Sequence, residues 1–150
     1  MDLKIREHYI AVAALLVGII AAVLIAPESS FFLPNFLYFW LPQGVVIALL
    51  SAFGIRPVAI AGCALAMTLH LIAYALWISS PHDALAWIGY LFSVPGAFAG
   101  AFIFGMIMKR APDRSALFVG TAASASALTG IGIIQIGLCC TVLYCGFHCP

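Results

Sequence analysis

The stretch 120-GTAASASALTGIG-132 consists almost entirely of glycine, alanine, serine and threonine, with only Leu128 and Ile131 larger. Ala122, Ser126 and Gly130 recur every four residues, a spacing that places side chains on one face of a helix. In a membrane, such a stripe of small residues lets two helix backbones approach closely. We therefore expect the helix that contains this stretch to be central in a helix bundle or to bind another helix.

A second small-residue pair, Gly96-x-x-x-Gly100, lies in 93-SVPGAFAGAFIFG-105. A single G-x-x-x-G is a weak signal in an apolar helix, but here it accompanies the longer run at 120–132. We expect these small residues to mediate helix packing or partner binding, and they are Gly96, Gly100, Ala122, Ser126 and Gly130.

The composition explains why membrane rules apply. The 150 residues are 65% hydrophobic and 7% charged, whereas a soluble domain carries about 25% charged residues. Too few polar side chains are available to cover a water-soluble surface, so the chain must be solvated by lipid. A net charge of +1 offers no basic face for nucleic acid. Residues 1–150 are expected to form a single integral membrane domain.

Five apolar stretches have the roughly 20 residues that a membrane-spanning helix needs. The expected fold is therefore all-α, a polytopic bundle of five transmembrane helices. The spans are expected at about 9–26, 36–54, 57–78, 84–108 and 116–143.

The charged residues predict the orientation of these spans. With five spans, all basic residues fall on one side of the membrane: Lys4, Arg6, Arg56, Lys109, Arg110 and Arg114. The positive-inside rule makes that side cytoplasmic. Three tryptophans come out near the opposite interface, where aromatic rings are enriched. They are Trp40, Trp77 and Trp87, and Tyr38, Tyr74, Tyr90 and Tyr144 lie nearby. We expect a bacterial inner-membrane protein with a cytoplasmic N-terminus and a periplasmic C-terminus.

Three polar residues are expected at membrane depth: Gln43, His70 and Gln135. Polar groups there mark an ion pathway or hydrogen-bond to another helix. For His70, the only ionisable residue that the expected spans contain, a proton-sensitive switch is the alternative to a packing role.

Motifs of enzymes are missing from the sequence. It contains no Walker loop, no G-x-S-x-G, no H-E-x-x-H and no paired acids. We expect no catalytic residue, no cofactor and no metal site.

Four cysteines cluster in the segment 138-LCCTVLYCGFHCP-150, and they are Cys139, Cys140, Cys145 and Cys149. Under the expected orientation this segment is periplasmic, where conditions are oxidising. Disulfides are the first hypothesis, and the sequence does not choose among the three pairings. Inert thiols near the membrane interface are the second, and metal or redox chemistry is the third.

The stretch 40-WLPQGVVIALLSAFGIRP-57 resembles the second helix of the bacterial membrane-associated sensor domains that precede diguanylate cyclase or histidine kinase modules. Trp40, Pro42, Gly44, Gly54 and Arg56 carry the resemblance. Those domains have more spans and a cytoplasmic output module. The resemblance therefore implies a sensory or accessory subunit whose output protein is separate.

Three functions remain. The first is a non-enzymatic protein that binds a partner within the bilayer, as an immunity protein does against a membrane-inserting or pore-forming toxin. The second is the sensory or accessory subunit. The third is a small transporter or channel component, in which Gln43, His70 and Gln135 line a path. The expected partners are the lipid bilayer and a membrane protein or further copies of the chain.

The disulfide hypothesis is tested by thiol alkylation of intact membranes without reductant. Paired cysteines at the C-terminal end resist a membrane-impermeant maleimide until a reductant is added, because only the thiolate reacts. The measurement is the mass shift of the C-terminal peptide before and after reduction. Complete labelling without reductant would contradict the disulfides.

Overall fold

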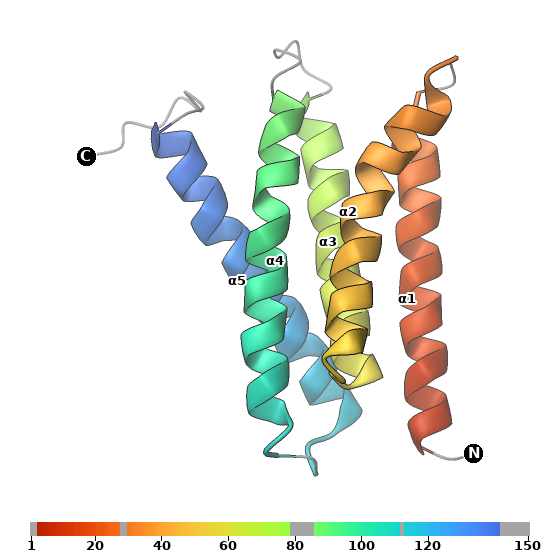
Figure 1. Ribbon diagram of the computed structural model, residues 1–150, viewed down its shortest axis with the longest axis vertical. Coiled ribbons are helices and arrows are strands. Elements are labelled where there is room, and N and C mark those ends of the chain that lie inside the picture. The colour runs from red at the N-terminus through yellow and green to blue at the C-terminus, as the bar shows by residue number, and fades with distance from the viewer. Residues whose placement is uncertain (1–2, 28–29, 79–85, 112, 142–150) are drawn as a thin grey trace.

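The chain forms five helices in the computed structural model, which describes residues 3–27, 30–78, 86–111 and 113–141. They run alternately up and down (Figure 1). Each is long and apolar enough to cross a membrane, which confirms the expected all-α, five-helix, multi-pass chain. The helices are α1 (Leu3–Ile25), α2 (Phe32–Ala52), α3 (Pro57–Ile78), α4 (Ala86–Met108) and α5 (Ala116–Thr141).

The observed helices begin earlier than expected at two places. Helix α1 begins at Leu3 rather than near residue 9, so it includes Arg6 and Glu7, which the sequence analysis placed outside the span. Helix α2 begins at Phe32 rather than near residue 36, and Pro34 lies in its first turn. A proline is tolerated there because the first backbone N–H groups of a helix have no partner within it.

The turn between α2 and α3 depends on one glycine. Gly54 has a φ of 64°, the left-handed conformation that glycine adopts without steric cost. Its N–H donates to Ser51 O, and the N–H of Ile55 donates to Leu50 O. These two bonds form a Schellman motif, which satisfies the last carbonyl groups of α2. Helix α3 then begins at Pro57, where a proline suits the first helical turn.

Helix α3 is the centre of the bundle. Two-thirds (67%) of its span is buried, against 22% for α5 and 17% for α1. Its buried side chains are mostly small, including Ala59, Ala61, Ala64 and Ala66. Small side chains let α1 and α5 both pack on α3, on which they have extensive contacts. The stretch 120–132 therefore belongs to a helix at the edge of the bundle and not to the central one.

Helix α5 meets α4 at a seam of small residues. A Cβ added to Gly96 or Gly130 would collide with the backbone carbonyl oxygen of the other, and a Cβ on Gly100 would collide with Ser126 O. The Ser126 hydroxyl also donates to Gly100 O at 2.9 Å. The predicted small residues of the two helices thus face one another within the chain.

A similar close approach joins α5 to α3. A Cβ on Gly62 would collide with Gly120 O. Helix α5 passes α4 on a slant, and its C-terminal end leans away from the other helices (Figure 1). The first part of α5 is therefore held by α3 and α4, and its last part is more open.

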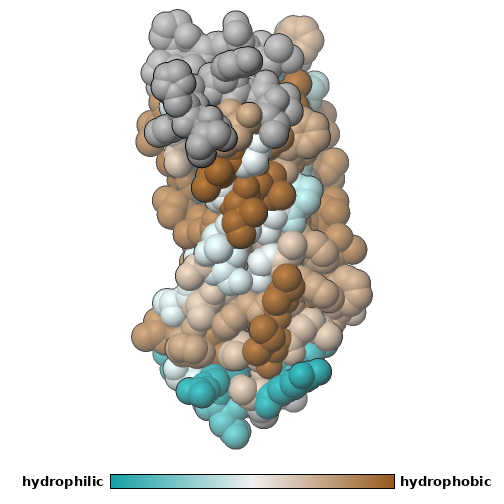
Figure 2. All heavy atoms as spheres, turned by 90° about the vertical axis from the view of Figure 1, so that its left-hand side faces the viewer, coloured by the Kyte–Doolittle hydropathy of each residue, from teal (hydrophilic) through white to brown (hydrophobic). Residues whose placement is uncertain are grey.

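Hydrophilic side chains gather at one end of the molecule, below a largely apolar surface (Figure 2). We call this the basic end and define it by Arg6, Arg56, Lys109, Arg110 and Arg114, all next to or near a helix terminus. Helix α1 begins at this end, and α5 ends at the opposite one (Figure 1).

The seam predicts different effects for two glycines of α5. Gly130→Leu places a side chain against the α4 backbone, which cannot yield, and should lower the free energy of unfolding by about 3 kcal/mol. Gly132→Leu is the matched control, because nothing lies within 4 Å of a Cβ at Gly132 and leucine favours helix over glycine. Unfolding by denaturant in detergent micelles, followed by circular dichroism, measures both. Equal midpoints would contradict the seam.

Candidate functional site

Polar groups of α2 and α4 meet at Tyr90, which is fully buried. Its hydroxyl accepts a hydrogen bond from Gln43 Nε2 at 3.1 Å and donates one to Phe39 O at 3.0 Å. Gln43 Nε2 also lies 3.3 Å from Phe39 O. The amide of Gln43, 2% exposed, therefore has partners without reaching water.

His70 of α3 is part of the same cluster. The Ser93 hydroxyl donates its single hydrogen to the backbone carbonyl oxygen of Tyr90 at 2.6 Å. His70 Nε2, 2.7 Å from Ser93 Oγ, is therefore the donor in that pair. The imidazole stacks on Tyr90 with ring centroids 5.6 Å apart. The structure thus gives His70 a partner on a neighbouring helix.

Gln135 of α5 reaches this cluster from the other side. Its Nε2 donates to the Tyr74 hydroxyl at 3.3 Å, and Tyr74 meets the His70 ring edge-on at 5.4 Å. Gln135 Oε1 is buried and accepts no hydrogen bond from a described residue. The three predicted polar residues are therefore brought together, with Tyr74 and Tyr90 between them.

This polar cluster ties four helices together in the half of the bundle opposite the basic end. Hydrogen bonds between membrane helices contribute about 0.6 kcal/mol each on average, so the cluster mainly fixes the register of the helices. Among the described residues, no group of three histidine, cysteine or acidic side chains could hold a metal ion.

The cysteines lie only partly within the described residues. Cys139 and Cys140, in the last turn of α5, are both disulfide-bonded in the structure. Cys145 and Cys149 lie outside the described residues, so the pairing remains a prediction. Cys63, which the sequence analysis did not single out, is a buried free thiol of α3.

The exposed side of α5 carries small and branched side chains at helical spacing. We call it the open face of α5 and define it by Ala125, Thr129, Gly132, Ile133 and Ile136. Ile133 and Ile136 are 65% and 67% exposed. The Thr129 hydroxyl donates to Ala125 O within the helix at 2.9 Å. This face is therefore apolar, and at Gly132 a second backbone can approach.

The small residues that the sequence predicted to mediate packing or partner binding do not belong to the open face of α5. Gly96, Gly100, Ser126 and Gly130 are used in the seam with α4, and Ala122 is half-buried. The four residues of the seam mediate helix packing inside the chain, and the open face of α5 consists of their neighbours along the helix.

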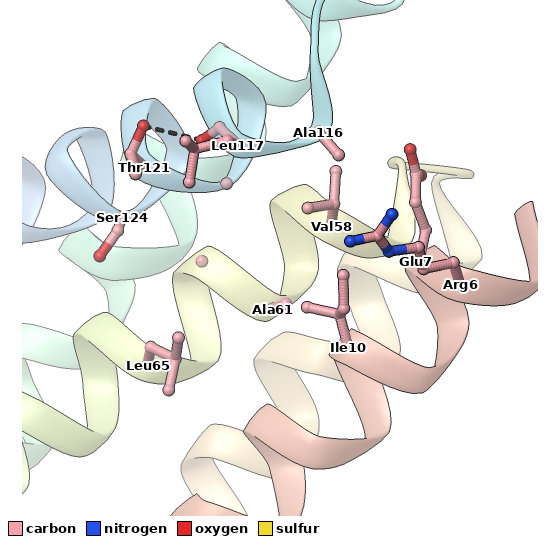
Figure 3. Close-up of a pocket in the computed structure, with 12 residues that line it drawn as sticks. Arg6, Glu7, Ile10, Val58, Ala61, Leu65, Ala116, Leu117, Thr121 and Ser124 are labelled. Atoms are coloured by element: carbon pink, nitrogen blue, oxygen red, sulfur yellow. Dashed lines mark hydrogen bonds between the residues drawn. The ribbon is translucent and has the colours of Figure 1, made fainter. Parts of the chain in front are cut away.

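A groove of about 460 Å³ opens at the basic end. Helices α1 and α5 form its walls and α3 forms its floor (Figure 3). The residues that line it are Arg6, Glu7, Ile10, Val58, Ala61, Gly62, Leu65, Ala116, Leu117, Gly120, Thr121 and Ser124.

The charged residues at the mouth of this groove differ in their surroundings. Glu7 is buried and forms an ion pair with Arg56. Arg56 also donates to Arg114 O at 3.2 Å, so its guanidinium links α1 to the segment that precedes α5. Arg6 is exposed, and its side chain makes no hydrogen bond or ion pair with another described residue.

Sequence reasoning missed several of these residues. Tyr74 and Tyr90 were taken only as aromatic residues near an interface, although both are buried and hydrogen-bonded. Glu7 was assigned to the region before the first span. An acid close to the start of an apolar helix is the signal that could have suggested an ion pair with a nearby arginine.

Comparisons with known proteins give no relative of this chain: no family model, no curated protein and no solved structure matches it.

The hydroxyl of Tyr90 should contribute measurably to stability. Tyr90→Phe deprives Gln43 of an acceptor and Phe39 O of a donor in a buried site, and we expect a loss of about 1 kcal/mol. Tyr9→Phe makes the same chemical change on the exposed face of α1 and should have no effect. Unfolding in detergent micelles measures both variants. An equal response of the two would show that the cluster does not stabilise the bundle.

Proposed function

We propose that this chain is a non-enzymatic membrane protein that binds a transmembrane helix of a partner within the bilayer, through the open face of α5. The observation that carries the proposal is Gly132. A Cβ at this position meets nothing within 4 Å, as at Gly137 further along α5, whereas a Cβ at Gly96, Gly100, Gly120 or Gly130 meets a neighbouring helix.

The physics of helix association in lipid supports this use of Gly132. Lipid tails are as apolar as leucine side chains, so two helices associate through close packing and not through the hydrophobic effect. Close packing requires small residues, and α5 provides the exposed Ala125 and Thr129 and the half-buried Gly132. Ile133 and Ile136 flank this small patch with branched side chains that can interlock with a partner.

The chemistry of the partner follows from the same face. It contains no charged residue, and the Thr129 hydroxyl is already bonded within its own helix. The fitting partner surface is therefore an apolar helix with small residues of its own.

In its narrower form, the proposal makes the chain an immunity protein of a bacterial inner membrane, with the basic end in the cytoplasm. The six lysine and arginine residues support this orientation through the positive-inside rule. A toxin that inserts into the membrane presents an apolar helix at the depth of the open face of α5.

A small transporter or channel component is the second candidate, and the polar cluster favours it. Gln43, His70 and Gln135 converge on two tyrosines in the membrane interior. Against this candidate, Gln43, Tyr90 and Ser93 are almost completely buried and bonded to one another. If transport is the function, His70→Ala should abolish it, whereas binding through α5 should tolerate this change.

The proposal is tested by cross-linking in cells of the organism that carries the gene. A photo-reactive amino acid at Ile133 should capture one partner, and Gly132→Leu should reduce its recovery about tenfold because the added side chain holds the helices apart. Gly132→Ala is a milder step on the same face. A photo-reactive residue at Ile103, exposed on α4, is the positional control. Mass spectrometry identifies what is recovered.

Each outcome decides between the candidates. A membrane-inserting toxin would support the immunity proposal, and a kinase or cyclase would support the sensory alternative. Recovery of the chain itself would indicate an oligomer, which suits the transport candidate. Equal capture from Ile133 and Ile103, or capture unchanged by Gly132→Leu, would overturn binding through the open face of α5.

A further inference from the structure

The groove at the basic end has the shape and charge of a lipid site. We propose that it binds a phospholipid with a net negative headgroup, whose phosphate lies at Arg6 and one of whose acyl chains lies along the groove. This proposal is independent of partner binding through the open face of α5, because it uses other residues at a different place in the bundle.

The length of the groove favours an acyl chain over a protein helix. Along α5 it extends from Ala116 to Ser124, eight helical steps or about 12 Å at the helical rise. The hydrocarbon core of a bilayer is about 30 Å thick, so the groove stays within one leaflet. A transmembrane helix would need a groove through both leaflets, whereas a lipid tail occupies one.

The lining of the groove suits such a tail. Below the mouth, the side chains of Ile10, Val58, Leu65 and Leu117 are apolar. The floor is formed by α3, where Ala61 lies between Val58 and Leu65 (Figure 3). The small side chain of Ala61 leaves room between α1 and α5, and the branched residues of the floor and the walls supply contacts for an alkyl chain.

The charge at the mouth selects the headgroup. The carboxylate of Glu7 is already paired with Arg56, so it does not neutralise Arg6. The Arg6 guanidinium, which lines the groove at its mouth (Figure 3), can bind a phosphate through two parallel hydrogen bonds. A zwitterionic lipid carries its own cation next to the phosphate, so it gains less from Arg6.

Native mass spectrometry of the 150-residue chain in detergent tests the proposal. The probes are phosphatidylglycerol and phosphatidylcholine with identical acyl chains. We expect phosphatidylglycerol to bind about fivefold more tightly, the factor typical of one basic residue near a membrane surface. Arg6→Gln should reduce its affinity to that of phosphatidylcholine. Arg110→Gln is the matched control, because it removes the same charge from the same end of the molecule, outside the groove.

Two variants that fill the groove test the site of the tail. The Ser124 hydroxyl makes no hydrogen bond with a described residue, and Thr121 is exposed with its hydroxyl bonded to Leu117 O. Ser124→Leu and Thr121→Leu should therefore fold, and both should weaken the binding of either lipid. Unfolding midpoints equal to that of the unaltered chain show that each variant is folded.

Three results would overturn the proposal. The first is an equal loss with Arg110→Gln and Arg6→Gln, which would indicate attraction to the basic end as a whole. The second is displacement of phosphatidylglycerol by inorganic phosphate, which would indicate that the tail makes no contribution. The third is unchanged lipid binding in folded Ser124→Leu and Thr121→Leu.

Discussion

The contact of helix backbones at three pairs of small residues is the constraint on which the rest of the bundle depends. Gly96 and Gly100 let α5 reach the backbone of α4, and Gly62 lets it reach the backbone of α3. A side chain at any of these positions would separate the helices, because the opposing atom is a main-chain carbonyl oxygen that has no rotamer to change. The slant of α5 follows from these contacts. Its start therefore lies beside the groove with α1, and its end carries the open face.

The opposite half of the bundle is held by other means, because its side chains are large. Tyr74 and Tyr90 are buried between the helices, and here the hydroxyl, imidazole and amide groups form bonds between helices. Without a hydrophobic force between helices in lipid, close packing and polar bonds are the available attractions. This chain uses close packing where α5 meets α3 and α4, and polar bonds in the opposite half. This division explains why its few interior polar residues converge on a single cluster.

The sequence was sufficient to predict the five helices, because length and apolarity alone decide whether a segment can span a membrane. It also singled out Gly96, Gly100, Ser126 and Gly130 as candidate packing residues. It did not show that their contacts are with one another, since small residues look the same whether a helix of the same chain or of a partner covers them. The central position of α3 was missed for a related reason: its alanines read as ordinary apolar residues, and their burial depends on which helices pack around them. Tyr74 and Tyr90 were misjudged because aromatic residues near a membrane interface face either lipid or the interior.

The basic residues are a second case in which the sequence alone does not show what each residue contacts. The positive-inside rule counts them equally, but the fold assigns them different tasks. Arg56 joins Glu7 to the segment before α5, and Lys109 donates to Phe53 O at the end of α2. Arg6 has no such task among the described residues, although it precedes Glu7 directly in the sequence. The fold does not need the Arg6 side chain for its own packing, and this side chain lies at the mouth of an apolar groove. Recognition of a lipid headgroup can therefore depend on Arg6.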